Sequence, residues 1–437
     1  MARLSVLWAT TAMLLALAQP ARAALPIEHW VAASGARVFF VRAPSIPMLD
    51  VRIDFDAGAR FDPPDRLGLA SLTLSMLAQG ADGLDETEIA ERFADVGARR
   101  GGGARDDRAT VSLRTLTAPQ EREAALALFA RVLSAPDFPA VVLERERARL
   151  AQALREAAIR PGVIAARAFD RALFGEHPYG RSAKPETALA IERADLERFY
   201  RAHYGAGRAV VSMVGAISRT EAEAIAERLT SGLPPTEPAP SIVPVPRAER
   251  GQEIRIAHEA TQSHILIGAT AMRRDDPDYF ALFVGNHVLG GGGFTSRLTN
   301  EVREKRGLAY SVYSYFSPGL HEGSFTVGLQ TEKARTEQAL SVVRDTLSAF
   351  LRNGPGEDEL RAAKDNLIGG FALRLDSNAE ILGHLSLIGF YDLGLDYLER
   401  WTDRVEAVSA DDVRSAFARH LGMERMTTVV VGAGPNQ

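Results

Sequence analysis

Cysteine is absent from this chain of 437 residues. Its absence excludes disulfide bonds, thiol catalysis and cysteine-ligated zinc or iron–sulfur sites. Any metal ion held by the chain would need histidine and carboxylate ligands. An excess of positive charge is also missing, because the formal net charge is −5. The sequence therefore gives no reason to expect nucleic acid as a partner.

Long apolar runs are missing beyond the first residues. Arg3 precedes the apolar run 4–18, and small residues around Ala23 offer a cleavage site, which is the pattern of an export signal. We expect residues 1–23 to be a signal peptide, with an uncleaved membrane anchor as the alternative. No later stretch has about 20 uninterrupted apolar residues. The mature chain is therefore expected to be periplasmic or secreted, without a membrane partner.

Closely spaced histidines are missing as well. The chain has nine histidines, and none lies three or four residues from another. That helical spacing is what allows two imidazoles to reach one zinc ion. We therefore expect the histidines to be structural or solvent-facing. His203 and His420, which occupy related places in the two halves of the chain, are expected to serve local packing or hydrogen bonding.

Proline is densest just past the middle of the chain, and this segment predicts a stiff, extended linker over residues 233–250. The linker separates an N-terminal lobe, residues 24–232, from a C-terminal lobe, residues 251–437. The ends of the two lobes align without a gap. Asp195, His203 and Gly215 recur 217 residues later as Asp412, His420 and Gly432, which indicates a duplicated unit.

Each half has the order of a mixed α+β unit. Strands grouped before and between long helices predict two homologous sandwich lobes, each a mostly antiparallel sheet with helices packed on one face. Asp195 and Asp412 are expected to open helices. In the first half the expected strands are 36–42, 50–57 and 110–115, and the expected helices are 68–79, 86–96, 119–133 and 139–159, the last stopped by Pro161 and Gly162.

Four consecutive glycines, Gly290, Gly291, Gly292 and Gly293, interrupt the second half. Such residues weaken a helix or strand by roughly 1 kcal/mol each. We expect a flexible hinge or a place of close backbone approach, with a plain loop as the alternative. The segment lacks the lysine and hydroxyl residue of a phosphate-binding loop, so a nucleotide site is not indicated.

A charged segment follows, in which Gly307 is expected to end a helix. Arg303 would lie in the last helical turn and Tyr310 early in the next strand, so both could face one cleft. Composition alone favours a simpler interpretation, in which Arg303 is a solvated charge and Tyr310 a core aromatic.

Residues 289–312 resemble the second-half signature of the pitrilysin/insulinase family of metallopeptidases, which includes the mitochondrial processing peptidases. The resemblance covers essentially the whole mature chain in order and implies two α+β lobes that close like a clamshell on a peptide. It is also carried by Ala57-Gly58-Ala59-Arg60 before Asp62-Pro63, by Gly68-Leu69-Ala70, by His177-Pro178-Tyr179-Gly180 and by residues 195–215.

In active members of that family, a His-x-x-Glu-His motif follows the Gly-Leu-Ala segment and supplies two zinc ligands and the general base. Here Ser71, Leu74 and Ser75 stand at those positions, and Ala153 stands where the distant glutamate ligand is expected. Glu156 lies one turn beyond it. The resemblance therefore implies that this chain has lost its zinc site and needs no cofactor of its own.

The resemblance also implies what is kept. Arg303 and Tyr310 match an arginine/tyrosine pair that binds substrate near the scissile bond, and Gly290–Gly293 match a loop linked to substrate handling. We expect a non-catalytic subunit that supplies Arg303 and Tyr310 to a composite active site. A homologous partner would carry zinc and the general base, and a peptide would be the substrate. The alternative is a peptidase-like scaffold or assembly protein without a role in proteolysis.

Overall fold

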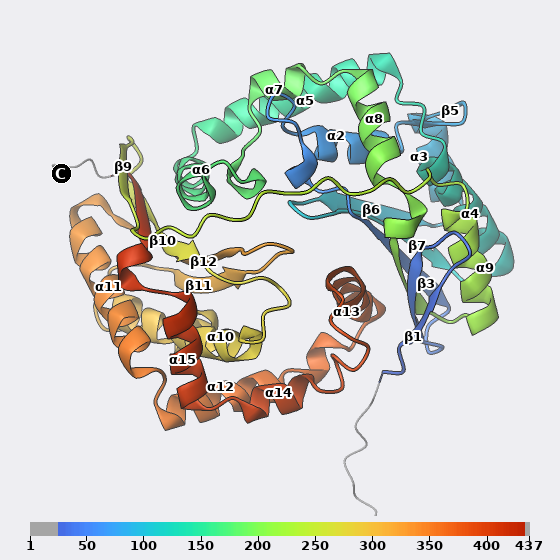
Figure 1. Cartoon of the computed structure of the whole chain (residues 1–437). Helices are drawn as coiled ribbons and strands as arrows, with labels where there is room; N and C mark the ends of the chain where they lie inside the picture. Colours follow the sequence, from blue (N-terminus) through green and yellow to red (C-terminus); the bar gives the residue numbers. More distant parts are fainter. Residues whose placement is uncertain (1–24, 433–437) are drawn as a thin grey trace, which may run out of the picture.

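The structure, a computed structural model, describes residues 25–432. The predicted signal peptide lies outside the described residues. The two halves of the chain form two lobes that face each other, as in a clamshell (Figure 1). No helix in the described range is both long and apolar enough to cross a membrane.

The first lobe contains a six-stranded sheet in the spatial order β1-β2-β8-β3-β7-β6. Neighbouring strands are antiparallel except for β2 and β8, which are parallel. A two-stranded hairpin, β4 (Gly80–Ala81) and β5 (Leu84–Asp85), lies apart from it. The six strands are β1 (Glu28–Val31), β2 (Arg37–Arg42), β3 (Met48–Phe55), β6 (Arg99–Ala104), β7 (Ala109–Leu116) and β8 (Val210–Gly215).

The second lobe contains a five-stranded sheet in the order β11-β12-β10-β13-β9. Only β9 and β13 are parallel. When β9, β13, β10, β12 and β11 are matched with β2, β8, β3, β7 and β6, the two sheets have the same order, as a duplicated unit predicts. The strands are β9 (Glu253–Ala257), β10 (Gln262–Thr270), β11 (Val312–Ser317), β12 (Ser324–Glu332) and β13 (Thr427–Gly432).

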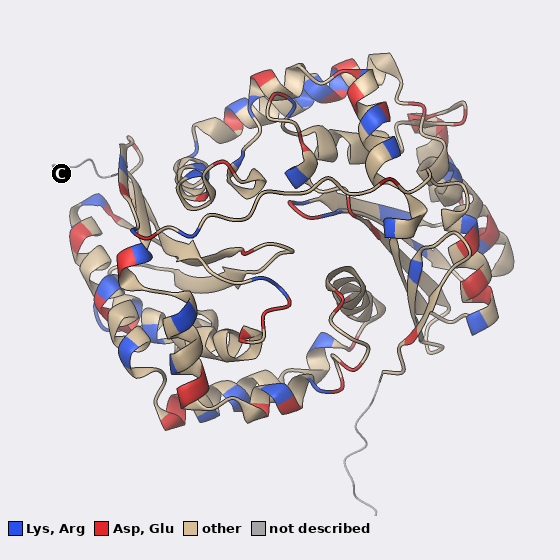
Figure 2. Cartoon of the chain, viewed as in Figure 1, with Lys and Arg blue, Asp and Glu red and all other residues tan. Residues whose placement is uncertain are grey.

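Helices cover the outer faces of both sheets, and positive and negative residues are interspersed along them (Figure 2). The first lobe has α2 (Leu69–Met76), α3 (Glu86–Asp95), α4 (Pro119–Ser134), α5 (Ala140–Ala158), α7 (Pro185–Leu189), α8 (Arg193–His203) and α9 (Arg219–Thr230). The second has α10 (Tyr279–Asn286), α11 (Thr336–Asn353), α12 (Glu357–Gly369), α14 (Trp401–Ala407) and α15 (Ala410–His420).

Two helices are exchanged between the halves. Helix α6 (Pro161–Phe174) belongs to the first half but packs on β10 and β13, and α13 (Asn378–Tyr391) of the second half packs on β2, β3 and β8. Val429 and Val431 face α6, whereas Val430 joins the core beneath the outer helices. Each sheet therefore carries the helices of its own half on one face, as predicted, and a single helix of the opposite half packs on part of its other face.

Helix ends follow the local sequence. Asp195 is the third residue of α8, and its carboxylate accepts a hydrogen bond from the Glu192 N–H at 2.9 Å. Asp412 accepts in the same way from the Ser409 N–H at 2.9 Å in α15. Both predicted helix starts are confirmed as capping boxes. Helix α5 ends at Ala158 as predicted, but Pro161 also opens α6.

The proline-rich segment 233–250 contains no helix or strand and crosses from one lobe to the other (Figure 1).

Candidate functional site

The three zinc-motif positions lie together on α2. Ser71, Leu74 and Ser75 line one hollow of about 360 Å³, whose other walls include the glycines of β6. Ser71 and Ser75 are exposed and Leu74 is half-buried. The Ser75 hydroxyl donates a hydrogen bond to the Leu72 carbonyl at 2.9 Å. Two neutral hydroxyls and an aliphatic side chain offer neither a good zinc ligand nor a proton acceptor.

Helix α2 is nevertheless firmly anchored at its start. Gly68, the N-cap residue, has φ +104° and no side chain to cap the helix. The Asp62 carboxylate takes that role and accepts from the N–H groups of Gly68 at 2.7 Å and Ala70 at 2.8 Å. Burial raises the pKa of Asp62 to about 6, although these hydrogen bonds act to lower it. The start of the helix that carries Ser71, Leu74 and Ser75 is therefore firmly held by Asp62.

The distant ligand position does not complete this hollow. Ala153 is exposed on α5 and is not among the residues that line it. Glu156 is also exposed, and its carboxylate accepts a hydrogen bond from Gln152 at 2.9 Å.

Arg303 and Tyr310 are brought together. The Arg303 guanidinium lies 4.9 Å from the centre of the Tyr310 ring and 4.7 Å from that of Phe294. Gly307, with φ +58°, ends the helical segment as predicted. Tyr310 is 85% exposed, so the expectation of a core aromatic is wrong. It also lies before β11, which begins only at Val312.

The contact between the Arg303 guanidinium and the rings of Tyr310 and Phe294 leaves the polar atoms of Arg303 and Tyr310 available. Cation–π contact uses the flat faces of the guanidinium and the rings, so the N–H groups at the guanidinium edge remain free to donate. One contact at that edge is an ion pair with Glu304 at 3.4 Å. Within the described part of the chain, no hydrogen bond is formed by the Tyr310 hydroxyl. The pair can therefore donate hydrogen bonds to carbonyl oxygens of a bound chain.

The glycine run is a helical turn and not a plain loop. Gly290 and Gly291 close the π-helical segment His287–Gly291 that continues α10. A Cβ atom on Gly290 would lie 2.4 Å from Ser314 Oγ and 2.7 Å from Ser314 N, and one on Gly292 would lie 2.6 Å from the His287 carbonyl oxygen. Close backbone approach is therefore confirmed. Arg303 lies in a second π-helical segment, Thr299–Glu304, and such segments are frequent at functional sites.

Two tyrosines that the sequence analysis did not single out lie beside this pair. Tyr313 and Tyr315 stack with ring centres 5.9 Å apart, and they are 44% and 43% exposed. Together with Tyr310 they line a hollow of about 570 Å³ between α6, β10 and β11. The signal was present in the alternation of residues 312–317, in which Val312 and Ser314 are buried and both tyrosines face outward.

A second hollow, of about 450 Å³, lies between the two halves. Its three carboxyls, those of Asp106, Asp107 and Asp170, all come from the first half. Burial raises the pKa of Asp170 to about 7, and the nearby Asp106 adds to the effect. Burial and repulsion from Asp107 raise the pKa of Asp106.

Asp107 joins the halves at this hollow. Its buried carboxylate accepts hydrogen bonds from the Tyr179 hydroxyl, from the Leu320 N–H at 2.9 Å and from the Tyr391 hydroxyl at 3.2 Å. It also pairs with Arg60 at 3.2 Å. Tyr179 belongs to the His-Pro-Tyr-Gly motif, and its hydroxyl also accepts a hydrogen bond from the His321 N–H of the second half at 3.3 Å, so that motif serves the contact between lobes.

The two repeat-related histidines have structural roles, as predicted. The His203 ring lies 4.3 Å from the Phe61 ring and 4.5 Å from the Phe199 ring, and burial lowers its pKa to about 4. His420 instead makes polar contacts with acidic residues at the start of α10.

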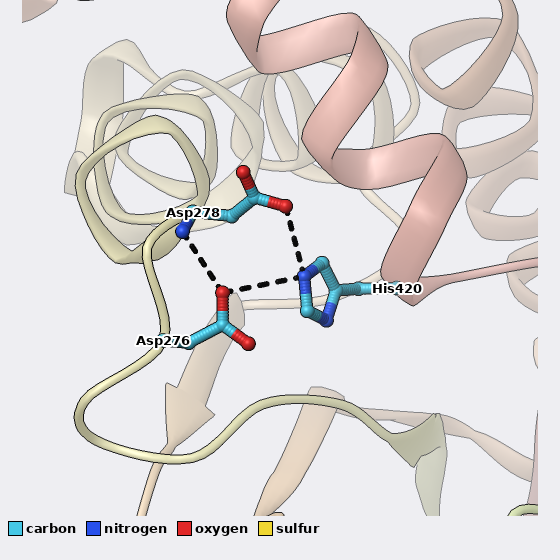
Figure 3. Close-up of side chains that lie close together, drawn as sticks. All are labelled: Asp276, Asp278 and His420. Atoms are coloured by element: carbon cyan, nitrogen blue, oxygen red, sulfur yellow. Dashed lines mark hydrogen bonds and ion pairs between the residues drawn. The ribbon is translucent and has the colours of Figure 1, made fainter.

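His420 and the acidic residues Asp276 and Asp278 form the one group of three or more potential metal ligands found in residues 25–432. His420 Nε2 lies 3.1 Å from Asp278 Oδ2 and 3.5 Å from Asp276 Oδ1 (Figure 3). Arg419 already pairs with both oxygens of Asp278, at 2.6 and 2.8 Å, and the Asp278 N–H donates to Asp276 Oδ1 at 2.8 Å. These contacts give the polar groups of Asp276, Asp278 and His420 partners within the protein. The group therefore connects α10 with α15.

The structure therefore contains two separate groups of predicted residues. Ser71, Leu74 and Ser75, but not Ala153, line one hollow in the first lobe, and Tyr310, in contact with Arg303, lines another beside the second sheet. No residue lines both hollows.

Comparison with known proteins matches both halves. Residues 37–184 match the insulinase family, peptidase family M16, and residues 190–367 match the peptidase M16 inactive domain. The crystal structure of a peptidase M16 inactive domain from Pseudomonas fluorescens is 38% identical, covers 94% of this chain and 98% of its own, and superposes with a TM-score of 0.90.

Two curated proteins are also similar. An uncharacterized zinc protease of Streptomyces coelicolor is 31% identical over 62% of this chain and 61% of its own length. A non-peptidase homologue of Helicobacter pylori, YmxG, is 24% identical over 88% of this chain and 89% of its own length. The match thus spans 61% of the length of the Streptomyces protein.

Proposed function

The chain belongs to the insulinase family, peptidase family M16, and from that membership we propose that it is a non-catalytic, substrate-binding subunit of a heteromeric zinc metallopeptidase. Its similarity to an M16 inactive domain and to a non-peptidase homologue supports a peptidase-like chain without its own catalytic zinc. Zinc and the general base would come from a homologous partner subunit, and the substrate would be a peptide.

The contact between Arg303 and Tyr310 is the observation that carries the proposal. A tyrosine with 85% of its surface exposed adds little to the core, yet its ring is held against Arg303. Arg303 is in turn held by Phe294, itself 73% exposed. Such a contact contributes only about 0.5–1 kcal/mol at an exposed site. Binding a ligand explains this arrangement better than stability does.

The first lobe offers a complementary feature. Strand β6 lies at the edge of its sheet and pairs only with β7 among the described strands. Arg99 through Gly103 are exposed along it. An extended peptide can add to such a free edge through backbone hydrogen bonds, and glycines leave that edge unobstructed. The edge also borders the hollow that holds Ser71 and Ser75.

Reconstitution with the zinc-bearing partner tests the proposal. In the mixed complex, Arg303→Ala and Tyr310→Phe should each lower kcat/KM for an unfolded peptide by about 10- to 100-fold, because each removes a hydrogen bond made near the transition state. Zinc content and complex formation should not change.

Arg306→Ala is the matched control. Arg306 lies three residues after Arg303 and pairs with Glu301 at 2.6 Å on the surface. Its replacement should leave turnover within about twofold, since exposed ion pairs contribute little. If both site variants turned over peptide like the wild type, the chain would instead be a scaffold or assembly protein.

Periplasmic or secreted localisation completes the proposal, on the basis of the signal-like residues 1–23. Cell fractionation with an antibody to the mature chain tests it, and recovery of the chain only in the cytoplasm would contradict it.

A further inference from the structure

The hollow between α6, β10 and β11 has a chemistry of its own. We propose that it binds a large uncharged side chain, preferably aromatic, of the peptide held at Arg303 and Tyr310. This inference rests on the proposed function and deepens it by naming the class of side chain that the site selects.

The lining of the hollow carries no charged residue. None of the 13 residues that line it is Asp, Glu, Lys or Arg. Among the lining residues, only His264 has a side chain that ordinarily titrates near neutral pH. Burial and the nearby His258 lower the pKa of its imidazole. A charged side chain entering this space would lose water without gaining a partner charge, which is unfavourable. An apolar or aromatic side chain would lose no such interaction.

Small residues of α6 keep the hollow open. Gly162, Ala165 and Ala166 follow one another at helical spacing and present one face to the second sheet. Gly162 lies directly beside His264, because a Cβ atom there would be 3.4 Å from the His264 Nδ1. The resulting volume of about 570 Å³ is within the range of ligand-binding pockets and exceeds that of one aromatic side chain.

Tyrosines form the opposite wall. The Tyr313 ring packs over Gly328 of the neighbouring strand, where a Cβ atom would be 2.5 Å from the ring. Tyr315 stacks beside it, and both tyrosines line the hollow. Aromatic rings favour offset or edge contacts with further aromatic rings. A phenylalanine or tryptophan side chain can therefore extend this stack.

The neighbouring hollow is chemically different. It shares Ala166, Leu266 and Tyr315 with the first but contains the carboxyls of Asp106 and Asp170. It also contains Arg105, Arg108 and Arg181. The surface along α6 thus changes from uncharged to charged, so the aromatic hollow is a distinct subsite and not part of one uniform cleft.

Fluorescence anisotropy with labelled decapeptides that differ at one central position tests the inference. The mature chain, and then the reconstituted complex, are titrated with peptides that carry Phe, Ser, Lys or Asp there. The Phe peptide should bind about tenfold more tightly than the Ser peptide, as burial of an aromatic side chain predicts. The Lys and Asp peptides should bind no better than the Ser peptide.

Two variants test whether this hollow is the source of the preference for the Phe peptide. Tyr313→Ala removes the stacking wall, and Ala166→Phe fills the hollow from an exposed position of α6. Each should reduce the preference for Phe to less than about threefold while the Ser peptide binds as before. Ala148→Phe, the same change at an exposed position of α5 outside the hollow, should leave the preference intact. Thermal unfolding confirms that the variants are folded.

The outcomes separate the inference from the function on which it rests. Equal affinity for the Phe and Ser peptides, or a preference that survives in both variants, overturns the aromatic subsite but leaves peptide binding in place. Absence of binding for every peptide, in the chain and in the complex, overturns the proposed function and the subsite together.

Discussion

At the scale of single residues, the resemblance and the composition made opposite predictions for Tyr310. Composition favoured a core aromatic because large apolar rings are usually buried. The ring is exposed and stacked on Arg303 instead. Whether Tyr310 is exposed depends on where β11 begins. The strand begins at Val312, and the Val312 side chain is buried in the core. A one-residue difference in register, which a single sequence does not specify, decides such a case.

The degenerate zinc positions were predicted from their place after the Gly-Leu-Ala segment, and the structure places all three in one hollow. That these positions offer no suitable zinc ligands follows from the side chains alone, without knowledge of the fold, because serine and leucine lack the required groups. In contrast, the hydrogen bonds of Asp107 join residues more than 200 positions apart in the sequence. No local pattern indicates that contact.

Asp170 provides a residue-scale prediction with a defined pH dependence. Its pKa is raised from 3.8 to about 7 by burial, so the folded state favours the protonated form. The stability that this proton provides is complete below about pH 4 and is lost as pH rises through 7. The melting temperature of Asp170→Asn, relative to wild type, should therefore rise between pH 5 and pH 8.

Thermal unfolding at the two pH values measures this difference. Asp358→Asn, at a position whose side chain is 95% exposed, is the control and should show a smaller change. A constant offset between Asp170→Asn and wild type at both pH values would contradict the assigned cause.

At the scale of elements, strands with strong apolar runs, such as β2, β3 and β7, were predictable, but the glycine-rich edge strand β6 and the exchange of α6 and α13 were not. The strands β8 and β13 nevertheless carried a signal. All six residues of each are buried, and a continuous apolar run is typical of a strand covered on both faces. Which helix supplies the second cover depends on the connection between lobes, and periodicity contains no information on that choice.

The glycine run gives the element-scale prediction. Gly290→Ala places a methyl group against the backbone of Ser314 in β11, and should lower the free energy of unfolding by about 2 kcal/mol. Urea unfolding measures the change. Gly369→Ala in α12 is the control, since a Cβ atom there meets nothing within 4 Å and should be neutral or stabilising by up to about 1 kcal/mol. Equal effects of the two substitutions would refute the packing argument.

At the scale of the whole molecule, the clamshell is held by contacts between halves. The exchanged helices bury apolar surface on the opposite sheets. The Asp107 carboxylate adds polar contacts from Tyr179 of the first half and from Leu320 and Tyr391 of the second. Two lobes were predicted from the repeat, but what joins them was visible only in the fold.

Asp107→Ala should weaken this joint. It leaves three donors without an acceptor. It also removes one ion pair of the nearly buried Arg60, which keeps its contacts with Asp56 and with the backbone carbonyl of residue 107. The free energy of unfolding should fall by about 3 kcal/mol, and the radius of gyration measured by small-angle scattering should increase. Asp358→Ala, on the surface, should stay within about 0.5 kcal/mol of wild type. An unchanged radius with unchanged stability would show that Asp107 does not join the halves.

The division of labour between two chains is the central claim, and peptide turnover measured together with zinc content tests it most directly. We predict that the purified chain holds no stoichiometric zinc and cleaves no peptide. The zinc-bearing partner alone should be weakly active, and turnover should rise until one copy of this chain is added per partner. Zinc bound to this chain with peptide cleavage in the absence of any partner would contradict the account.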